Sequence, residues 1–376
     1  KSQKEPQYKV NIEEYAQAKG LEIEWRVPSH LERQLSLQNN FPLAKYYFSL
    51  EKSAIDLIQD LVQHTESILT PIRSNMEFMG DIIKLDRSTI LADLKITLAK
   101  SSVVILSGEG GVGKTAVIKD FYTNVKETTP IIVFKATEFN ISNINDIFNA
   151  YGNFKLTEFM EVYQLKEEKY IVIDSAEKLS DIEDPSIFQE FLSILINNEW
   201  KIIFTTRHSY LDDLKFELIE IYKLPFLLLN IGEIKKGELE NLSSKYCFNL
   251  PQNEKLLELL QRPFYLAEYL SEYGNIENSA SLSDFINLLW NKQILKLPHR
   301  RNNIHIRREN CFLQIAHKRA NEGQFFVNIK GYDNEALQSL EIDEIIKYDV
   351  KSGGYFITHD IYEEWALDKM IERAYI

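Results

Sequence analysis

Gly108-Glu-Gly-Gly-Val-Gly-Lys-Thr115 fits the pattern G-x-x-x-x-G-K-[ST] at every fixed position. The apolar run Val103-Val-Ile-Leu106 precedes this stretch, and a helical pattern begins near Lys114. Glycines let the backbone wrap so that successive N–H groups point inward as an anion site, which the positive end of the following helix strengthens. The stretch therefore predicts a phosphate-binding loop (P-loop) between a buried strand and a helix.

This loop predicts that the chain binds ATP or ADP together with Mg²⁺. Lys114 is expected to reach the β- and γ-phosphates as a point charge, and the Thr115 hydroxyl is expected to ligate Mg²⁺. The residues expected to contact the nucleotide in and beside the loop are Gly108, Glu109, Gly110, Gly111, Val112, Gly113, Lys114, Thr115 and Ala116.

The loop lies among short apolar runs that alternate with helical stretches. Each run is nearly continuous in apolar residues, which is typical of parallel strands buried on both faces. Repeated strand–helix units predict an α/β fold with a doubly wound parallel sheet. The predicted strands are Val103–Leu106, Ile131–Phe134, Tyr170–Ile173, Lys201–Phe204 and Phe226–Leu229.

Four regions are predicted along the chain. Residues 1–80 form a helical connector, 81–230 the P-loop nucleotide-binding domain, 231–295 a small helical domain and 296–376 a winged-helix domain. The small helical domain contains predicted helices at Pro263–Ser271 and Leu282–Leu297. The last region contains a predicted hairpin, with strands at Ile345–Val350 and Tyr355–Thr358 around a turn at 351–354.

Two further apolar runs end in side chains that suit ATP hydrolysis. Tyr170-Ile-Val-Ile-Asp174 places Asp174 beside the P-loop to hold Mg²⁺, and Glu177 is a candidate general base for the attacking water. Lys201-Ile-Ile-Phe-Thr-Thr-Arg207 ends in a guanidinium that can sense the γ-phosphate, if its strand lies between the P-loop strand and the Asp174 strand. The alternatives are a helix N-cap for Asp174, a solvated turn residue for Glu177 and a surface arginine for Arg207.

Two competing P-loop classes lack their signatures. A GTPase needs Asn-Lys-x-Asp, but Asn291-Lys-Gln-Ile294 has no aspartate and lies in a predicted helix. An ABC cassette needs Ser-Gly-Gly before the magnesium aspartate, whereas Ser352-Gly-Gly354 follows Asp174 by a long stretch.

Composition narrows the choice of partners. The 376 residues carry 43 Lys and Arg against 56 Asp and Glu, a net charge of -13, which argues against a general nucleic-acid coat. A local basic segment, residues 296–319, leaves DNA binding open but not favoured. Cys247 and Cys311 match no metal spacing or disulfide framework, which fits a cytoplasmic location. No apolar stretch approaches the ~20 residues of a membrane helix, so no membrane partner is expected.

Several of these motifs resemble the STAND class of P-loop ATPases, which includes NACHT and NB-ARC proteins. Asp174-Ser-Ala-Glu177 resembles the NACHT magnesium motif, and Thr205-Thr-Arg207 resembles the NB-ARC sensor strand. Arg262-Pro263 resembles the Gly-x-Pro element, whose proline packs near the adenine, although the glycine is absent here. Leu85-Asp-Arg87 resembles the Gly-Arg-Glu motif that lies against the nucleotide. Thr358-His-Asp360 resembles the Met-His-Asp signature, and this implies that His359 contacts the ADP β-phosphate and locks a closed form.

Two further stretches, Phe356–Leu367 and Trp25–His30, resemble bacterial antiviral STAND proteins of the Avs type. This resemblance implies an ATP/ADP-dependent switch that homo-oligomerises when a protein trigger acts on a sensor outside this chain. It also implies that the chain is the central ATPase core of a longer protein with slow, regulatory hydrolysis.

Two other functions stay open. One is a DNA-binding AAA+ ATPase of the initiator or helicase-loader kind, which also pairs a P-loop domain with a winged helix. The other is a nucleotide-binding scaffold that does not turn over ATP.

Overall fold

The computed structural model describes residues 7–21, 54–149, 151–152, 154–182, 184–296, 303–322, 326–328, 331–349 and 353–375. The chain divides into two compact units, residues 1–56 and 57–376. Helix α1 (Gln7–Ala18) belongs to the first unit, and α4 (Ala54–Leu69) begins at its end. The motif Trp25–His30 lies outside the described residues.

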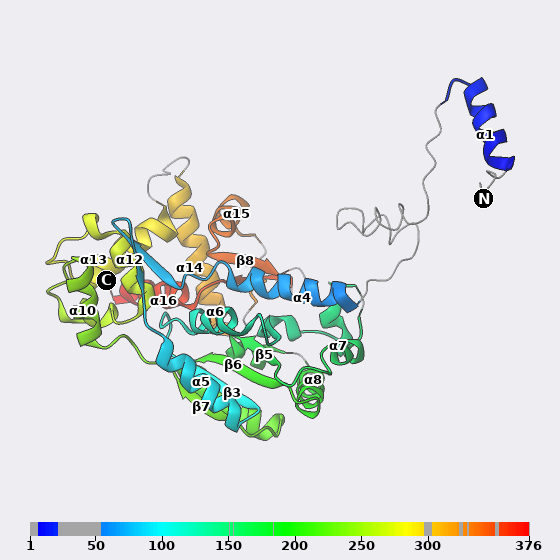
Figure 1. Ribbon diagram of the computed structural model, residues 1–376. Coiled ribbons are helices and arrows are strands. Elements are labelled where there is room, and N and C mark those ends of the chain that lie inside the picture. Colours follow the sequence, from blue (N-terminus) through cyan, green and yellow to red (C-terminus); the bar gives the residue numbers. More distant parts are fainter. Residues whose placement is uncertain are drawn as a thin grey trace. The chain divides into compact units, whose positions relative to one another are not determined.

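Five of the described strands form one parallel sheet, with the P-loop strand β3 inside it (Figure 1). The strand order is β4-β5-β6-β3-β7, so β6 lies between β3 and β5, as the sensor role of Arg207 requires. All five predicted apolar runs are strands, and the predicted α/β fold class is confirmed. The strands are β3 (Val103–Gly108), β4 (Ile131–Lys135), β5 (Tyr170–Asp174), β6 (Lys201–Arg207) and β7 (Leu227–Asn230).

Helices cover both faces of this sheet. Successive residues of β3 point to opposite faces: Val104 packs in the core with Leu94, whereas Ile105 packs in the core with Phe191. The first face carries α5 (Ser88–Lys100) and α6 (Lys114–Val125), and the second carries α7 (Leu156–Val162), α8 (Pro185–Asn197) and α9 (Leu211–Phe216). Burial on both faces explains why β3, β4, β5 and β6 are continuous apolar runs, whereas Leu227 and Leu228 of the edge strand β7 are exposed. Short helical turns in this region are η2 (Ala136–Phe139), η3 (Ile144–Phe148), η4 (Ala176–Asp181), η5 (His208–Tyr210) and η6 (Glu217–Ile221).

Helix α4 covers the edge strand β4. The fully buried Thr65 hydroxyl accepts a hydrogen bond from the Val133 backbone N–H at 3.1 Å. Leu57 and Leu61 of the same helix join the core beneath the sheet. An edge strand offers unpaired backbone groups to other chains, so this cover protects the sheet from unwanted pairing.

A hairpin precedes the nucleotide-binding region, where the sequence analysis assigned no strands. It consists of β1 (Asn75–Phe78) and β2 (Asp81–Lys84). Met79 and Gly80 both have positive φ, 49° and 92°, as a two-residue hairpin turn requires. Phe78 packs against Phe248 and Tyr273, so the hairpin belongs to the core of the C-terminal region.

The C-terminal region shares a single hydrophobic core that includes Leu289, Phe312 and Trp365. The helix predicted at 263–271 is present, and that predicted at 282–297 continues past Trp290 as a π-helical turn; Leu297 lies outside the described residues. The predicted hairpin is also present, although the last residue of its first predicted strand and the first two residues of its turn, 350–352, lie outside the described residues. The predicted domain borders stay predictions. The elements are α10 (Lys236–Tyr246), α11 (Glu254–Leu259), α12 (Pro263–Ser271), η7 (Tyr273–Asn275), α13 (Leu282–Trp290), η8 (Asn291–Leu295), α14 (Ile304–Glu322), α15 (Asn334–Ile342), β8 (Ile346–Asp349), β9 (Gly354–Ile357) and α16 (Asp360–Tyr375).

In the part of the chain that the structure describes, no helix combines the length and apolar character needed to cross a membrane.

Candidate functional site

The P-loop joins the carboxyl end of β3 to Lys114, the first residue of α6. Gly111 and Gly113 have φ angles of 82° and 93°, in the left-handed region that glycine adopts without steric cost. The Lys114 ammonium group donates hydrogen bonds to the carbonyl oxygens of Gly108 at 2.8 Å and Glu109 at 3.0 Å. These bonds place the cation over the loop that it is predicted to serve.

Asp174, at the end of β5, lies against the first turn of α6. Its Oδ1 atom accepts hydrogen bonds from Thr115 Oγ1 at 3.3 Å and from Thr205 Oγ1 at 2.7 Å. Thr205 Oγ1 in turn accepts the Ser175 backbone N–H at 3.0 Å. Thr205 therefore fixes Asp174 from the neighbouring strand, a role that was not predicted for it from the sequence.

Thr115 and Asp174 offer the donor atoms that Mg²⁺ prefers. Magnesium binds few protein oxygens and keeps water and phosphate oxygens as its other ligands. Among the described residues, no group of three or more His, Cys, Asp or Glu could hold a metal ion. The pair thus fits a magnesium ion carried in with nucleotide phosphates, where the cation neutralises charge on the phosphoryl group.

Glu177 and Arg207 face each other at the edge of the loop. Glu177 lies in η4, and Arg207 ends β6 directly opposite Gly108 in the strand ladder. Glu177 Oε1 lies 3.7 Å from Arg207 Nε, and the side chains are only 6% and 9% exposed. Opposite charges attract more strongly when water is largely excluded. The predicted general base and the predicted γ-phosphate sensor therefore form one ion pair.

Arg87 lies beside the other end of the loop. Its Nη1 atom donates hydrogen bonds to Asp120 Oδ2 at 2.8 Å and to the Ser74 carbonyl oxygen at 3.2 Å. Its Nη2 atom is 3.7 Å from the position that a Cβ on Gly113 would take. The ion pair with Asp120 on α6 thus holds a guanidinium next to the loop.

Helix α12 contacts the loop through its first turn. Pro263 occupies the first helical position, where the missing N–H of proline costs nothing. The next residue, Phe264, donates its backbone N–H to the Gly111 carbonyl oxygen at 3.1 Å. Pro263 therefore lies one residue from a direct contact with the P-loop.

His359 lies at the start of α16. Its Nδ1 atom accepts the Ile361 backbone N–H at 3.3 Å, and its ring stacks on Phe264 at 5.2 Å between centroids. Because Nδ1 accepts, the ring hydrogen of neutral His359 is on Nε2. Ile361 Cδ1 lies 3.1 Å from where a Cβ on Gly111 would be. The start of α16 thus contacts both α12 and the P-loop.

A buried hydrogen bond joins α12 and α16. Trp365 Nε1 donates to Tyr265 Oη at 3.2 Å. Burial raises the pKa of the Tyr265 phenol to about 12, so the hydroxyl keeps its proton at neutral pH. The two helices therefore contact the loop as a connected pair.

The predicted site residues outside the loop all lie close to it or to a residue that contacts it. These are Arg87, Asp174, Glu177, Arg207, Pro263 and His359. The contacting residues that were missed include Thr205, Phe264, Ile361 and Glu364. A hydroxyl at the end of the strand beside Asp174 could have indicated Thr205, whereas the two apolar side chains carry no chemical signal in the sequence.

The described cations of the basic segment contact oxygen atoms of the chain itself. Arg308 is 1% exposed and donates hydrogen bonds to the carbonyl oxygens of Ile294 at 2.8 Å and Gln293 at 3.0 Å. Arg300 and Arg301 lie outside the described residues. The other contacts are Lys296 with Asp343, Arg307 with Asp333 and Glu335, Arg308 with Asp343, Lys318 with the Asn328 carbonyl, and Arg319 with Glu363.

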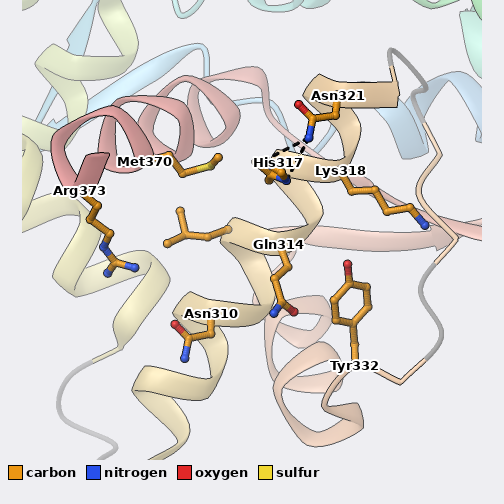
Figure 2. A pocket seen from close by; sticks show the side chains of 9 residues that line it. Asn310, Gln314, His317, Lys318, Asn321, Tyr332, Met370 and Arg373 are labelled. Carbon is orange, nitrogen blue, oxygen red and sulfur yellow. Dashed lines mark hydrogen bonds between the residues drawn. The ribbon is translucent and has the colours of Figure 1, made fainter. Parts of the chain in front are cut away.

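A separate hollow of 660 Å³ lies between α14 and α16 (Figure 2). Side chains from one face of α14 and from the second half of α16 line it, and none of them belongs to the predicted nucleotide site. The lining residues are Asn310, Leu313, Gln314, His317, Lys318, Asn321, Tyr332, Met370 and Arg373.

The strand order and the loop give the chain the α/β fold of a P-loop ATPase, which is consistent with ATP hydrolysis. No protein-family model and no curated protein matches the chain.

Many solved structures are similar in outline, and three of them illustrate the likeness. A Walker-type ATPase of Pyrococcus abyssi is 13% identical with a TM-score of 0.44, over 78% of this chain and 98% of that one. The ORC2 protein of Aeropyrum pernix in ADPNP–ADP complexes is 14% identical with a TM-score of 0.36, over 78% and 96%. The ORC1 protein of Aeropyrum pernix in complex with DNA is 12% identical with a TM-score of 0.37, over 75% and 92%. These TM-scores and identities are too low to indicate a function, so the function is inferred from the residues of the site.

Proposed function

We propose that this chain is an ATP/ADP-dependent molecular switch of the STAND class. The observation that supports it is the contact of α12 and α16 with the P-loop, which we term the closed arrangement. In it, Phe264 is hydrogen bonded to Gly111 and Ile361 lies against the same glycine. A ligand shifts a two-state equilibrium only if it interacts differently with the two states. A nucleotide at this loop meets that condition, because the loop is shared with the C-terminal region.

The proposed chemistry uses the residues around the loop. Lys114 and the loop N–H groups bind the phosphates, while Thr115 and Asp174 hold Mg²⁺. Glu177 accepts a proton from the attacking water. A γ-phosphate that engages Arg207 competes for the partner of Glu177, so this ion pair would couple arrival of the triphosphate to release of the base.

The wider role of the switch follows from the sequence resemblance. We infer that the chain is the central core of a prokaryotic antiviral defence protein. A protein trigger would allow ATP to replace bound ADP, and the protein would then form homo-oligomers. A cytoplasmic location agrees with the free thiols of Cys247 and Cys311.

Replacing His359 tests whether its contact with the ADP β-phosphate stabilises the closed arrangement. His359→Ala should release ADP roughly 10–100-fold faster, because it removes one hydrogen bond to a charged phosphate, worth about 1.5–3 kcal/mol. Stopped-flow fluorescence with a labelled ADP measures the rate, and light scattering with ATP measures assembly, which should increase.

The matched control is His317→Ala, which removes an exposed imidazole on α14. His359→Gln keeps an N–H donor and should restore part of the slow ADP release, which separates donation to phosphate from the stacking on Phe264. Wild-type ADP release and assembly in His359→Ala would mean that His359 only caps α16.

The second candidate is a DNA-binding ATPase of the initiator kind. Two of the similar structures are ORC proteins, and one of them is in complex with DNA, which agrees better with this candidate than with the switch. Against it, the described cations of the basic segment contact the chain's own oxygen atoms. We therefore place the switch first.

Duplex binding by the whole chain distinguishes the two candidates. We expect no change in the fluorescence anisotropy of a labelled duplex at up to about 10 μM protein, because affinity in such complexes comes mainly from cations on phosphates. Binding that weakens steeply as salt is added would favour the initiator candidate instead. The slope of log affinity against log salt concentration should then correspond to the release of several counterions.

A further inference from the structure

A carboxylate of the C-terminal helix lies against the P-loop. Glu364, on α16, places its Oε1 atom 3.2 Å from the position that a Cβ on Gly110 would take. Ile361 lies one turn earlier on the same helix and contacts Gly111, so residues three apart present one helical face to the loop. Because Gly110 has no side chain, the half-buried acid can approach the backbone of the loop.

The charge of Glu364 matters because of what the loop is built to bind. The N–H groups of the loop, the start of α6 and the Lys114 ammonium group all favour negative charge. A carboxylate and a terminal phosphate are therefore alternative anions for the same electropositive surface. When both are present they repel each other, and the repulsion is stronger at a half-buried position than in water.

The neighbouring acid on α16, Glu363, does not face the phosphate-binding loop. Glu363 points to Arg319 on α14 and forms an ion pair of 2.8 Å, with both side chains nearly buried. Its charge is therefore balanced inside the C-terminal region. Glu364 is the next residue and lies on the face that contacts the loop.

We propose that Glu364 determines nucleotide specificity in the closed arrangement: its carboxylate disfavours a triphosphate and leaves a diphosphate acceptable. The inference rests on the proposed switch and gives it a physical cause. ATP then binds at the expense of the contact between α16 and the loop, so the extra phosphate drives the C-terminal region away. No residue of the hydrolytic set is needed for this discrimination.

The test is Glu364→Gln, which keeps the size of the side chain and removes its charge. Calorimetry gives Kd for ADP and for a non-hydrolysable ATP analogue, each with Mg²⁺. We expect the analogue to bind about 10-fold tighter in Glu364→Gln while ADP affinity changes little, since one unit charge close to the phosphate is removed. The matched control is Glu372→Gln, the same change eight residues further along α16, or about 12 Å away at 1.5 Å per residue.

The dependence of the two Kd values on ionic strength is a second test. A purely structural role of Glu364 would not make their ratio depend on salt. Added salt screens the repulsion, so the preference of the wild-type chain for ADP should weaken, whereas that of Glu364→Gln should not. An unchanged ratio of the two Kd values in Glu364→Gln, with both nucleotides bound, would overturn the inference and leave the switch standing. Failure of the wild-type chain to bind either nucleotide would overturn the proposed function and the inference together.

Discussion

Lys114→Ala should bind ADP and ATP at least 100-fold more weakly than the wild-type chain. The substitution removes the ammonium group over the loop, whose predicted partners are two phosphate groups. Each hydrogen bond between charged groups is worth about 1.5–3 kcal/mol, and about 1.4 kcal/mol is one decade of affinity. Two such bonds give about two to four decades, so calorimetry at micromolar protein should detect no binding.

The fold of Lys114→Ala should survive, because the Lys114 side chain is only half-buried and donates hydrogen bonds to the carbonyl oxygens of Gly108 and Glu109 in the loop itself. Circular dichroism and the thermal midpoint check this. The matched control is Lys126→Ala, which removes the same charge at the far end of α6, where Lys126 pairs weakly with Glu66. Wild-type affinity in Lys114→Ala would show that the nucleotide, if bound, lies elsewhere.

The central sheet could be predicted because four of its five strands, β3 to β6, are buried on both faces. Burial leaves no polar position in a run such as Tyr170–Ile173, and the chemistry of the site begins where the run ends, at Asp174. The role expected of Arg207 requires β6 to lie between β3 and β5, and the sheet has that order. In this part of the molecule the apolar runs therefore predict the strands, and the polar residues that follow them predict the site.

The contacts between distant segments could not be predicted from the sequence. Ile361 is an ordinary apolar residue of a helix, and only the tertiary arrangement brings it to Gly111. The hairpin at 75–84 was missed because its strands are four residues each and its signal is one glycine turn at Met79-Gly80. Both features depend on packing rather than on the local pattern.

Charge counts along the sequence left DNA binding open at one segment. The basic segment stands out because it contains a single acid, Glu309. Its acidic partners come from later residues, and Asp343 contacts both Lys296 and Arg308. A cluster that is basic in sequence is therefore largely neutralised in space.

The ion pair between Glu177 and Arg207 leads to the second large effect. Glu177→Gln should keep nucleotide affinity and slow ATP turnover by roughly 10²–10⁴-fold, the usual contribution of a general base. Gln keeps the shape of the side chain but cannot take a proton from water. Phosphate release under saturating ATP measures the rate, and calorimetry measures the affinity.

A matched control and the possible outcomes show whether Glu177 is the general base. Glu190→Gln is the matched control, because it makes the same change at an exposed position on α8. If Glu177→Gln hydrolyses ATP at the wild-type rate, Glu177 is only the partner that positions Arg207, and Asp174 becomes the candidate base. If the wild-type chain itself leaves ATP intact after long incubation, the site is a nucleotide-binding scaffold, and the switch must act through nucleotide exchange alone.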